Sequence, residues 1–536
     1  MSLRRAWCVL RQEQSYKGFG RESTMPDIDP VSSTNPATES LKKAPAWIGK
    51  KYSLNGFEKP IVTTPFTYMF PELANDKQCL VPQFAETLQY LSELGAAMRD
   101  EDHDPKFNSS IPAAYTYFGQ FINHDTAFLD IKKSHGMTNS ELLADPDLKP
   151  WSNQMIFERV RNKRAKPLAL DSIYGRMDAG MSPLRDPQNP DKLALGMVSL
   201  SGDRPKDKDD YNDLVRYPIS ADHRQDRRAV IADPRNDSNL ILSQLHVAFL
   251  RAHNAIVEKK KCSYEEAKKI LQKHYHWMIL HDFLRKLVSD ETIQKTQSEP
   301  LYNPKDGIPL EFSMGAFRFG HSMIRRSYYV NDGLGLTRLA QLFTLLVLCH
   351  DFKPTFGKGF ATLPEWAIIQ WEKFLDPATN PARVLRTQMV EPLFELLDGS
   401  SLIVDGERRL AVQDLKRAYM MRIPTGQSIA DRLNVDRLVP EEIKTFTTPR
   451  QFQVLQDAGF LKHTPLIFYI LVEAVKSNNE KLGPIGGRIV AEVLIGLMRD
   501  VTDSIIGSDW KPDLGLVPGT FNLPDLFRLA GVLKNS

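Results

Sequence analysis

The sequence predicts a mainly α-helical protein built around one large core. Apolar residues recur at intervals of three and four in several long segments, a spacing that gathers them on one face of a helix. Alternating runs that would indicate strands are rare. With 536 residues, of which 42% are hydrophobic and 25% charged, the chain can bury a substantial core. We therefore expect one large helical domain with little β-structure over residues 61–536.

The periodic segments differ in composition from the stretches around them. Residues 1–60 mix Ser, Thr, Pro, Asn and Lys without sustained periodicity, which predicts a loosely ordered N-terminal arm. Residues 201–228 are dense in Asp, Lys and Arg, which predicts a solvated surface loop. The expected helices are 86–98, 240–259, 264–288, 336–349, 465–475 and 487–498.

The net charge of the chain and its short apolar stretches do not identify a binding partner or a cellular compartment. A formal charge of +3 is too small to indicate nucleic-acid binding. The later apolar stretches are shorter than the roughly 20 residues of a membrane span, so we expect none. The apolar run at 6–10 is too short for a signal-peptide core. We expect a soluble protein, cytoplasmic or exported without a leader, and its oligomeric state is not indicated.

Gln120 and His124 form the first candidate pair. They are four residues apart in an apolar segment and would share one helix face. A neutral histidine there could act as a general base, with Gln120 positioning a small polar substrate. The alternative is an ordinary hydrogen-bonded core histidine.

Arg235 is the second candidate. Asp233 is a suitable N-cap and Pro234 a suitable first helical residue, so Arg235 would lie in the first turn. The helix dipole disfavours a cation there, which indicates that Arg235 is held for another purpose. Placement on the surface is the alternative.

His321 is the third candidate, three residues after Arg318 in an aromatic, glycine-containing run. A neutral imidazole suits iron, and apolar surroundings tune the redox chemistry of a bound metal. A metal-ligand role for His321 is therefore one interpretation of this segment.

Taken in this order, the three segments resemble the animal-type haem peroxidases of the peroxidase–cyclooxygenase superfamily, and the bacterial-type, peroxinectin-like branch most closely. The resemblance continues through Arg417 and the segment 483–492 and covers about residues 60 to 536. It implies a helical fold around a buried haem b. The implied activity is reduction of hydrogen peroxide through a ferryl haem, with oxidation of small organic donors and with halide oxidation left open.

The resemblance also implies a role for each matching residue. His124 would move the peroxide proton, Arg235 would stabilise the charge that develops as the O–O bond breaks, and Gln120 would orient water or a halide. His321 would bind the haem iron on the proximal side. Arg318 and Arg417 would pair with the haem propionates, and Asp414 would hydrogen-bond the proximal imidazole.

Two departures from the family pattern change what we expect of the cofactors. Asn123 and Ser238 stand where relatives with ester-linked haem carry acids, so we predict a noncovalent haem. Asp125 and Asp171 match acids of the family's calcium site, but Ala169 stands where a further acid is usual. Calcium, which prefers six to eight oxygen ligands, is left open.

Other activities remain as alternatives. Fatty-acid oxygenases of this superfamily place a radical tyrosine where this chain has Arg318, which disfavours that chemistry or a related biosynthetic oxidation. A metal-dependent phosphohydrolase of the HD type would use the His-Asp pairs beginning at His124, His281 and His350. A haem-binding protein without turnover is the non-enzymatic alternative.

Overall fold

The computed structural model describes most of the chain after residue 62. The described ranges are 63–100, 104–132, 139–175, 185–200, 210–219, 227–343, 361–395 and 407–533. They belong to one compact unit, Pro45–Ser536. The predicted arm at 1–60 lies outside the described residues.

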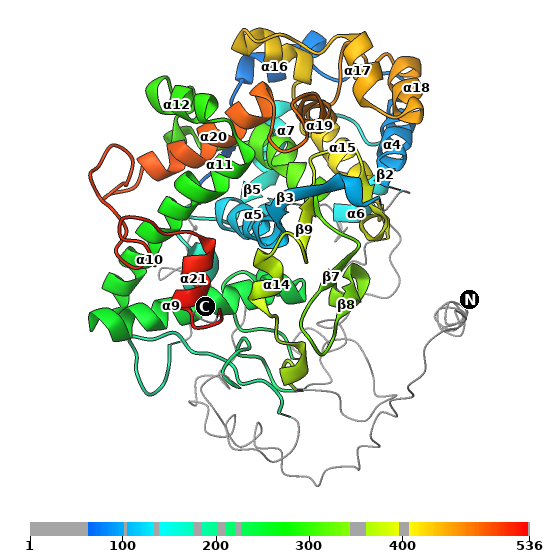
Figure 1. Cartoon of the computed structure of the whole chain (residues 1–536). Coiled ribbons are helices and arrows are strands. Elements are labelled where there is room, and N and C mark those ends of the chain that lie inside the picture. The colour runs from blue at the N-terminus through cyan, green and yellow to red at the C-terminus, as the bar shows by residue number, and fades with distance from the viewer. Residues whose placement is uncertain are drawn as a thin grey trace, which may run out of the picture. The chain divides into compact units, whose positions relative to one another are not determined.

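The described unit is mainly helical, as predicted (Figure 1). Its α-helices are α3 (Pro71–Asn75), α4 (Thr87–Ala97), α5 (Ala113–Thr126), α6 (Asn139–Ala144), α7 (Asn153–Arg159), α8 (Asp171–Tyr174), α9 (Leu240–Lys260), α10 (Tyr264–Met278), α11 (Leu284–Leu287), α12 (Asp290–Ser298), α14 (Trp371–Leu375), α15 (Leu410–Met420), α16 (Gly426–Leu433), α17 (Pro440–Phe446), α18 (Pro449–Asp457), α19 (Leu466–Lys476), α20 (Pro484–Arg499) and α21 (Leu523–Leu529).

Short helices of other types and short strands connect these helices. The 3₁₀ and π segments are η1 (Lys77–Cys79), η2 (Pro105–Phe107), η5 (Pro234–Asp237), η6 (Ile279–Phe283), η7 (Pro304–Asp306), η8 (Glu311–Gly315), η9 (Ala316–Met323), η10 (Glu365–Ala367) and η11 (Glu391–Phe394). The described strands form two-stranded pairs: β1 (Phe66–Thr67) with β6 (Ile308–Pro309), β2 (Arg99–Asp100) with β10 (Met389–Val390), β3 (Asn108–Pro112) with β9 (Pro381–Arg383), β4 (Leu129–Ile131) with β5 (Val160–Asn162), and β7 (Ser327–Tyr329) with β8 (Leu336–Arg338).

The core is built from long helices that are buried on most sides. Helix α9 begins where Asn239 accepts a hydrogen bond from the Leu242 amide, and it ends at Lys261 in a left-handed conformation. It packs against α5, α10 and α21. Helices α19 and α20 also pack against each other and carry almost continuous apolar sequence. These helices bury apolar side chains on most of their faces, and removing this surface from water stabilises the core of the unit.

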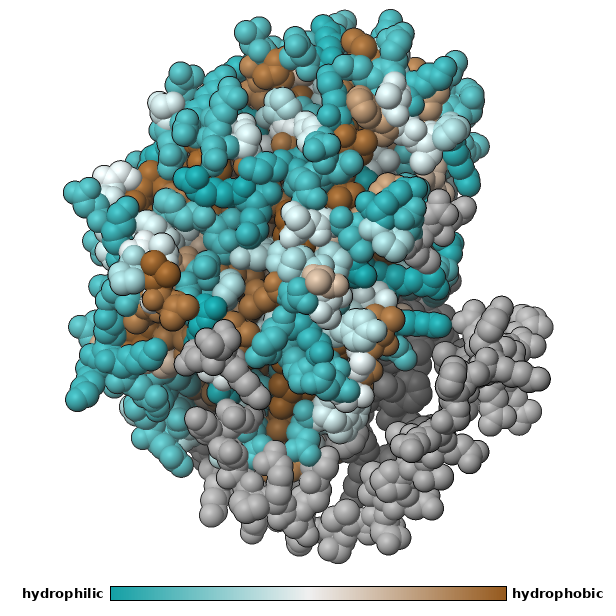
Figure 2. Space-filling model, viewed as in Figure 1, coloured by the Kyte–Doolittle hydropathy of each residue, from teal (hydrophilic) through white to brown (hydrophobic). Residues whose placement is uncertain are grey.

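One described helix, α9, is long and apolar enough to cross a membrane by length and composition, but 83% of its most apolar window is buried inside the protein. This burial is typical of a core helix. Hydrophilic side chains cover most of the described surface on the face in Figure 2, and apolar residues appear there in separate patches.

The predicted helices agree with the structure in all but one segment. The prediction of a helix at 336–349 is wrong at its start, because Leu336–Arg338 is strand β8. Gly335, with a φ of 61°, closes a turn in which Val330 and Gly335 are hydrogen-bonded, and the turn returns the chain beside β7. Helix follows at 339–343, and 344–349 lie outside the described residues.

The prediction of a solvated loop at 201–228 is wrong for part of the described stretch. Asp213 and Arg216 are buried, and Arg216 binds Asp213 at 2.8 Å and Asp237 at 2.8 Å. Two carboxylates compensate the buried guanidinium, which makes burial of this charge tolerable. The pairs attach this segment to η5, the short helix that carries Arg235.

Candidate functional site

His124 lies near the end of α5 and is only 7% exposed. Helix α5 follows Pro112, whose extended conformation starts it, and Phe118 and Phe121 on the same helix are buried in the core. The His124 Nδ1 atom is 2.9 Å from Oδ1 of Asn236. Its Nε2 atom has no hydrogen-bond partner among the described residues.

A second contact of Asn236 fixes which nitrogen of His124 carries the proton. The Asn236 amide Nδ2 donates to Nδ1 of His246 on α9, at 3.1 Å. With its NH₂ group facing His246, Asn236 presents its carbonyl oxygen to His124, so Nδ1 of His124 is the protonated nitrogen. The Nε2 lone pair of His124 is then available to accept a proton.

The electrostatic surroundings keep His124 neutral. Burial lowers the pKa of His124 to about 3, and the positive charge of Arg235 contributes in the same direction. Burial likewise lowers the pKa of His246 to about 4. Both imidazoles are therefore uncharged near pH 7, as a base and its hydrogen-bonded support require.

Arg235 lies in the 3₁₀ helix η5. This helix begins as predicted, with Asp233 as its N-cap and Pro234 as its first residue, and the Asp233 carboxylate accepts a hydrogen bond from the Arg235 amide. The guanidinium donates to Asp233 through Nε at 3.0 Å and Nη2 at 2.7 Å. It also donates to the carbonyl oxygens of Ala127 and His124, at 3.0 and 2.9 Å. One N–H of Nη1 is left for a ligand, since each terminal nitrogen carries two.

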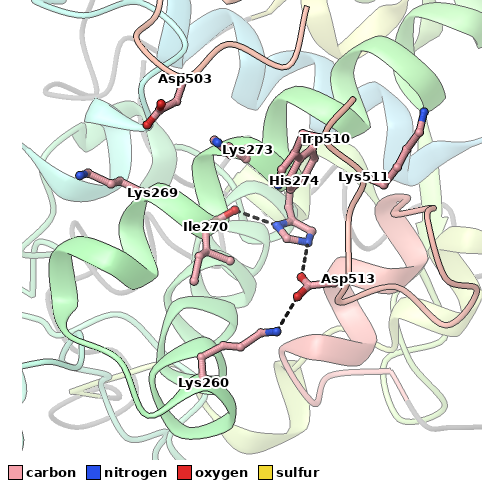
Figure 3. Close-up of a pocket in the computed structure, with 9 residues that line it drawn as sticks. All are labelled: Lys260, Lys269, Ile270, Lys273, His274, Asp503, Trp510, Lys511 and Asp513. Carbon is pink, nitrogen blue, oxygen red and sulfur yellow. Dashed lines mark hydrogen bonds and ion pairs between the residues drawn. The ribbon is translucent and has the colours of Figure 1, made fainter. Parts of the chain in front are cut away.

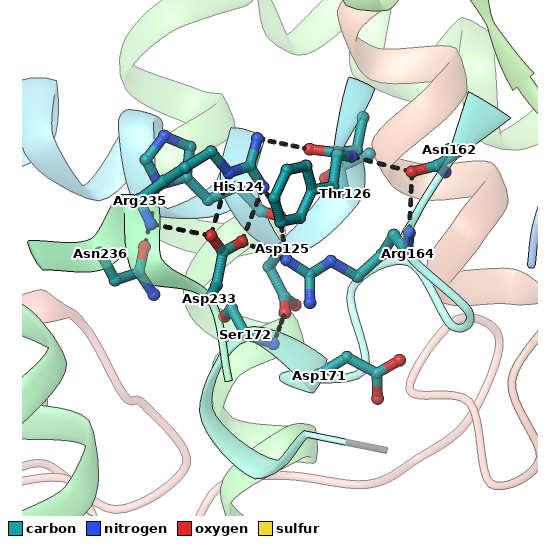
Figure 4. Close-up of polar contacts among 12 residues, drawn as sticks. His124, Asp125, Thr126, Asn162, Arg164, Asp171, Ser172, Asp233, Arg235 and Asn236 are labelled. Atoms are coloured by element: carbon teal, nitrogen blue, oxygen red, sulfur yellow. Dashed lines mark hydrogen bonds and ion pairs between the residues drawn. The ribbon is translucent and has the colours of Figure 1, made fainter. Parts of the chain in front are cut away.

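A second arginine shares these partners. Arg164 donates to the carbonyl oxygen of His124 at 2.9 Å and forms a short ion pair with Asp233, as Figure 4 shows. Burial would raise the pKa of Asp233, but Arg235, His124 and Arg164 outweigh it and hold the pKa well below its usual range. Asp233 is therefore the ionised carboxylate between two guanidinium groups.

His321 lies in an irregular helical segment, where the π-helix η8 passes into the 3₁₀ helix η9. Gly315 joins the two, and a Cβ there would lie 2.8 Å from Leu466 of α19. The close approach of α19 thus requires glycine at the junction. Nδ1 of His321 is 2.8 Å from Oδ2 of Asp414 on α15, and Nε2 has no partner among the described residues.

Two arginines lie near this pair. Arg417, buried on α15, contacts Asp414 at 3.2 Å, and its buried Nε atom has no partner within the described ranges. Burial and the neighbouring charge of Arg318 lower the pKa of Arg417 to about 10. Arg318 donates through Nε to the Ser313 carbonyl at 3.0 Å. The two cations share one described carboxylate, Asp414, which suits an additional anionic ligand.

The fold brings the two histidine-bearing regions together. Helix α5 packs against η9. After the larger effect of burial, the charges of Arg164 and Arg318 lower the pKa of Arg235, so Arg318 lies within electrostatic range of the η5 turn. Three segments far apart in sequence thus meet around His124 and His321.

The remaining predicted site residues lie on the same elements. Gln120 and Asn123 are partly exposed on α5, one turn and one residue before His124. Ser238 ends η5 and is exposed. No described residue forms a hydrogen bond with the Gln120 side chain.

Asp125 and Asp171, at which calcium was left open, are engaged by backbone amides. Both Asp125 oxygens accept backbone amides, from Ser172 and Leu170, and Asp171 accepts the Lys166 amide. In the described ranges no group of three His, Cys, Asp or Glu residues could hold a metal ion. The Ser172 Oγ atom is buried without a partner among the described residues, and calcium, which prefers six to eight oxygen ligands, stays open here.

The His-Asp pairs do not support the phosphohydrolase alternative either. His281 stacks on Trp277 at 3.8 Å between ring centroids, and Asp282 accepts hydrogen bonds from Tyr115 and the Leu523 amide. The pair at 350–351 lies outside the described residues.

A separate surface cavity of about 380 Å³ lies between the end of α9, α10 and the loop after α20 (Figure 3). In it, Lys260 pairs with Asp513 at 2.5 Å, and His274 donates from Nδ1 to the Ile270 carbonyl. It shares no residue with the cluster around His124 and His321. Its lining residues are Lys260, Lys269, Ile270, Lys273, His274, Asp503, Trp510, Lys511 and Asp513.

Asn236 and Arg164 are the site residues that the sequence analysis missed. Asn236 directly follows Arg235 at the start of a helix, and this adjacency was a usable signal. Arg164 lies in a lysine- and arginine-rich stretch that resembles ordinary surface sequence, so nothing local distinguishes it.

Comparison with known proteins identifies the family. Residues 158–345 match the family model for animal haem peroxidase; this range includes Arg235 and His321 but not His124. A peroxidase-like protein of Margaritifera margaritifera is 24% identical over 41% of the chain, and a peroxidasin homolog of Caenorhabditis briggsae is 25% identical over 51%. The chain spans 32% and 22% of these relatives' own lengths.

Solved structures show the same fold. Peroxidase A from Dictyostelium discoideum aligns with a TM-score of 0.53 and 13% identity over 89% of this chain and 95% of its own. A fatty acid alpha-dioxygenase from Arabidopsis thaliana aligns with a TM-score of 0.50 and 12% identity over 78% and 71%. The match over residues 158–345 thus places an animal haem peroxidase domain within the chain, and the motifs and the mainly helical fold agree with it.

Proposed function

We propose that this chain is a haem-dependent peroxidase, with residues 61–536 as its catalytic domain, that reduces hydrogen peroxide and oxidises small organic donors. The observation that carries the proposal is the arrangement of His124. Its Nδ1 is bound to Asn236, its Nε2 has no partner in the described part of the chain, and Arg235 contacts its backbone carbonyl. A neutral base beside a fixed cation is suited to moving a proton during peroxide cleavage.

The residues present fit a haem. His321 offers Nε2 as an iron ligand while Asp414 engages Nδ1 at 2.8 Å. A carboxylate partner of this kind fixes the ring orientation and raises the basicity of the ligand. Arg417 and Arg318 have too few described carboxylates for their charge, and no described residue bonds the buried Nε of Arg417. Haem propionates would supply the missing negative charge.

When bound, the haem supplies the iron at which the peroxide O–O bond is split and electrons are drawn from reductants. Nε2 of His124 accepts the proton from hydrogen peroxide and returns it to the departing oxygen, which leaves as water. Arg235 stabilises the negative charge on that oxygen through its remaining Nη1 N–H. Asp233 holds the guanidinium in place with two hydrogen bonds, so little reorganisation accompanies the charge shift.

The haem is held without a covalent link in this proposal. Asn123 and Ser238 cannot form the carboxylate esters of related enzymes, and Ser238 is exposed. Binding then depends on His321, on apolar contacts and on the propionate-binding arginines. Fatty-acid dioxygenation is less well supported, because Arg318 stands where that chemistry requires a tyrosine.

The test is the absorption spectrum of protein purified with added haem, before and after hydrogen peroxide, together with peroxide-dependent oxidation of a phenolic dye. We expect a Soret band that shifts with peroxide, and dye turnover. A haem spectrum without turnover would indicate a passive haem binder. Oxygen uptake with a fatty acid but no dye oxidation would favour the dioxygenase activity, and folded protein without haem would refute the proposal.

A further inference from the structure

The surface cavity of Figure 3 has more positive than negative charges in its walls. Its charged lining residues are Lys260, Lys269, Lys273, Lys511, Asp503 and Asp513, with a net charge of +2. Lys260 is paired with Asp513 at 2.5 Å. In the described part of the chain, no ion pair joins the other three lysines to a carboxylate. The cavity therefore has positive charge available for an anionic ligand.

The three lysines are arranged at a cost. Lys269 and Lys273 are four residues apart on α10, and like charges at this spacing on a helix repel each other. Nζ of Lys273 lies 5.9 Å from the ring centre of Trp510, and Nζ of Lys511 lies 5.1 Å from that of Trp277. The two aromatic rings hold these ammonium groups near the cavity. A bound anion would offset the repulsion between them.

His274 presents a buried acceptor to the same cavity. It is 1% exposed, and its Nδ1 is 2.8 Å from the Ile270 carbonyl oxygen. Because a carbonyl oxygen only accepts, Nδ1 carries the proton and Nε2 of the neutral ring has a lone pair. Burial lowers the pKa of His274, which keeps the ring neutral near pH 7. Nε2 is directed at Asp513 (Figure 3), 3.6 Å from Oδ1, and no described residue forms a hydrogen bond with it.

The unpartnered nitrogen limits the chemistry of the ligand. Nε2 of His274 and the Asp513 carboxylate are both acceptors, so neither satisfies the other. A buried polar atom without a partner is destabilising, and a ligand with an O–H group would satisfy it. The lysines thus favour negative charge, and His274 favours a hydrogen-bond donor. Hydrogen phosphate offers both, whereas sulfate at pH 7 has the charge but no O–H.

The cavity is larger than a single ion requires. Its volume of about 380 Å³ is at the lower end of the range of about 300–1,000 Å³ for sites that bind small organic molecules. Ile270 and the partly exposed Trp510 give it an apolar wall. A phosphate group attached to a small organic body therefore fits as well as the free ion.

We propose that this cavity binds a phosphate group together with an O–H donor, either as hydrogen phosphate or on a small phosphorylated metabolite. Lys269, Lys273 and Lys511 act on the phosphate as point charges. Nε2 of His274 accepts the O–H, and the Trp510 ring contacts the organic part where one is present. The cavity contains no residue of the proposed peroxidase site, so this assignment does not depend on that function.

The first experiment compares phosphate with sulfate by isothermal titration calorimetry, on the full chain purified with added haem. At about pH 7.5 and equal ionic strength we expect saturable phosphate binding, and sulfate binding at least about fivefold weaker because it makes one hydrogen bond fewer. No saturable binding of phosphate, or equal affinity for sulfate, would overturn the proposal.

Glycerol phosphate distinguishes the two sources of the phosphate group. It adds hydroxyl groups and a small organic body to the same charge. Tighter binding than inorganic phosphate would assign the cavity to a phosphorylated metabolite, and weaker binding would assign it to the free ion.

The second experiment changes the cavity. The double variant Lys269→Gln, Lys273→Gln loses two charges and should bind phosphate at least about tenfold more weakly. Lys295→Gln, at an exposed position on α12 outside the cavity, is the matched control and should bind as wild type. His274→Asn keeps an amide donor for the Ile270 carbonyl but has no Nε2, so it should bind phosphate and sulfate with equal affinity.

Each outcome bears on a named residue. Unchanged phosphate affinity in the double lysine variant would place the ion elsewhere and overturn the assignment. A preference for phosphate that survives in His274→Asn would remove His274 as the acceptor. If His274→Asn does not fold, the lysine variants and the sulfate comparison still test the proposal. If the protein does not react with peroxide, the proposed function fails while the phosphate result stands.

Discussion

Replacing Asn236 with leucine tests the hydrogen-bond chain from His246 to His124. Asn236 is fully buried and uses both ends of its amide, at 2.9 Å to His124 and 3.1 Å to His246. Leucine has a similar volume but bonds neither imidazole. Each of the two buried nitrogens left without a partner costs about 1–3 kcal/mol, so the free energy of unfolding should fall by about 2–6 kcal/mol.

The same change should slow peroxide cleavage. Without Asn236, neither the tautomer nor the ring orientation of His124 is fixed. A hydrogen bond worth about 1.4 kcal/mol accounts for about a tenfold loss, and full loss of general acid–base catalysis for about 10²–10⁴-fold. We expect the bimolecular rate constant for the reaction with peroxide to decrease by a factor between about 10 and about 10⁴. Stopped-flow absorbance on haem-loaded protein measures this constant.

Asn236→Asp is the matched control. A carboxylate oxygen still accepts from Nδ1 of His124, so this variant should retain most of the peroxide rate while it loses the amide donor to His246. Urea unfolding of both variants without haem reports the stability effect separately. A peroxide rate in Asn236→Leu within about twofold of wild type, less than about 0.5 kcal/mol, would refute the reasoning.

Three further predictions concern the haem and two buried acids. His321→Ala should weaken haem binding by at least about 100-fold, above the 10–100-fold cost of losing an outer partner of a metal ligand. His463, a partly exposed histidine between α18 and α19, is the control, and His463→Ala should leave haem binding unchanged. Haem titration followed at the Soret band decides, and equal affinities of the two variants would remove His321 as the ligand. Acidic butanone should extract the haem completely from denatured protein, and haem retained with the polypeptide would contradict the noncovalent prediction. Burial raises the pKa values of Glu311 and Glu473 from 4.5 to about 7. Since the unfolded chain releases these protons first, each acid should lower the free energy of unfolding by about 1.4 kcal/mol per pH unit between about pH 5 and 7. Urea unfolding of Glu311→Gln should therefore lose this slope relative to wild type, and parallel pH profiles would show that the Glu311 carboxyl is not perturbed.

The sequence by itself determined the helical class and most helix positions, because apolar spacing and capping residues are local signals. Asp233 and Pro234 start η5 as their order predicts, and α4, α9, α19 and α20 lie within one to three residues of the expected bounds. It also supplied the three motifs around His124, Arg235 and His321, since the order of short motifs along the chain carries the family resemblance.

Only the tertiary structure decided how these motifs are supported. The helix predicted from residue 336 begins as strand β8, because a turn at Gly335 and pairing with β7 override the apolar spacing. Asp213 and Arg216, in a stretch that reads as solvated, are buried because their charges compensate each other across the fold.

Arg164 shows the same limit at the site itself. Its partners Asp233 and His124 lie 69 and 40 residues away in sequence, and no local pattern encodes either contact. The acids matched to a calcium site by sequence order, Asp125 and Asp171, accept backbone amides in the folded chain. Long-range hydrogen bonds and charge pairs depend on which elements the core brings together, so they are decided by packing, whereas helix formation and motif order are decided along the chain.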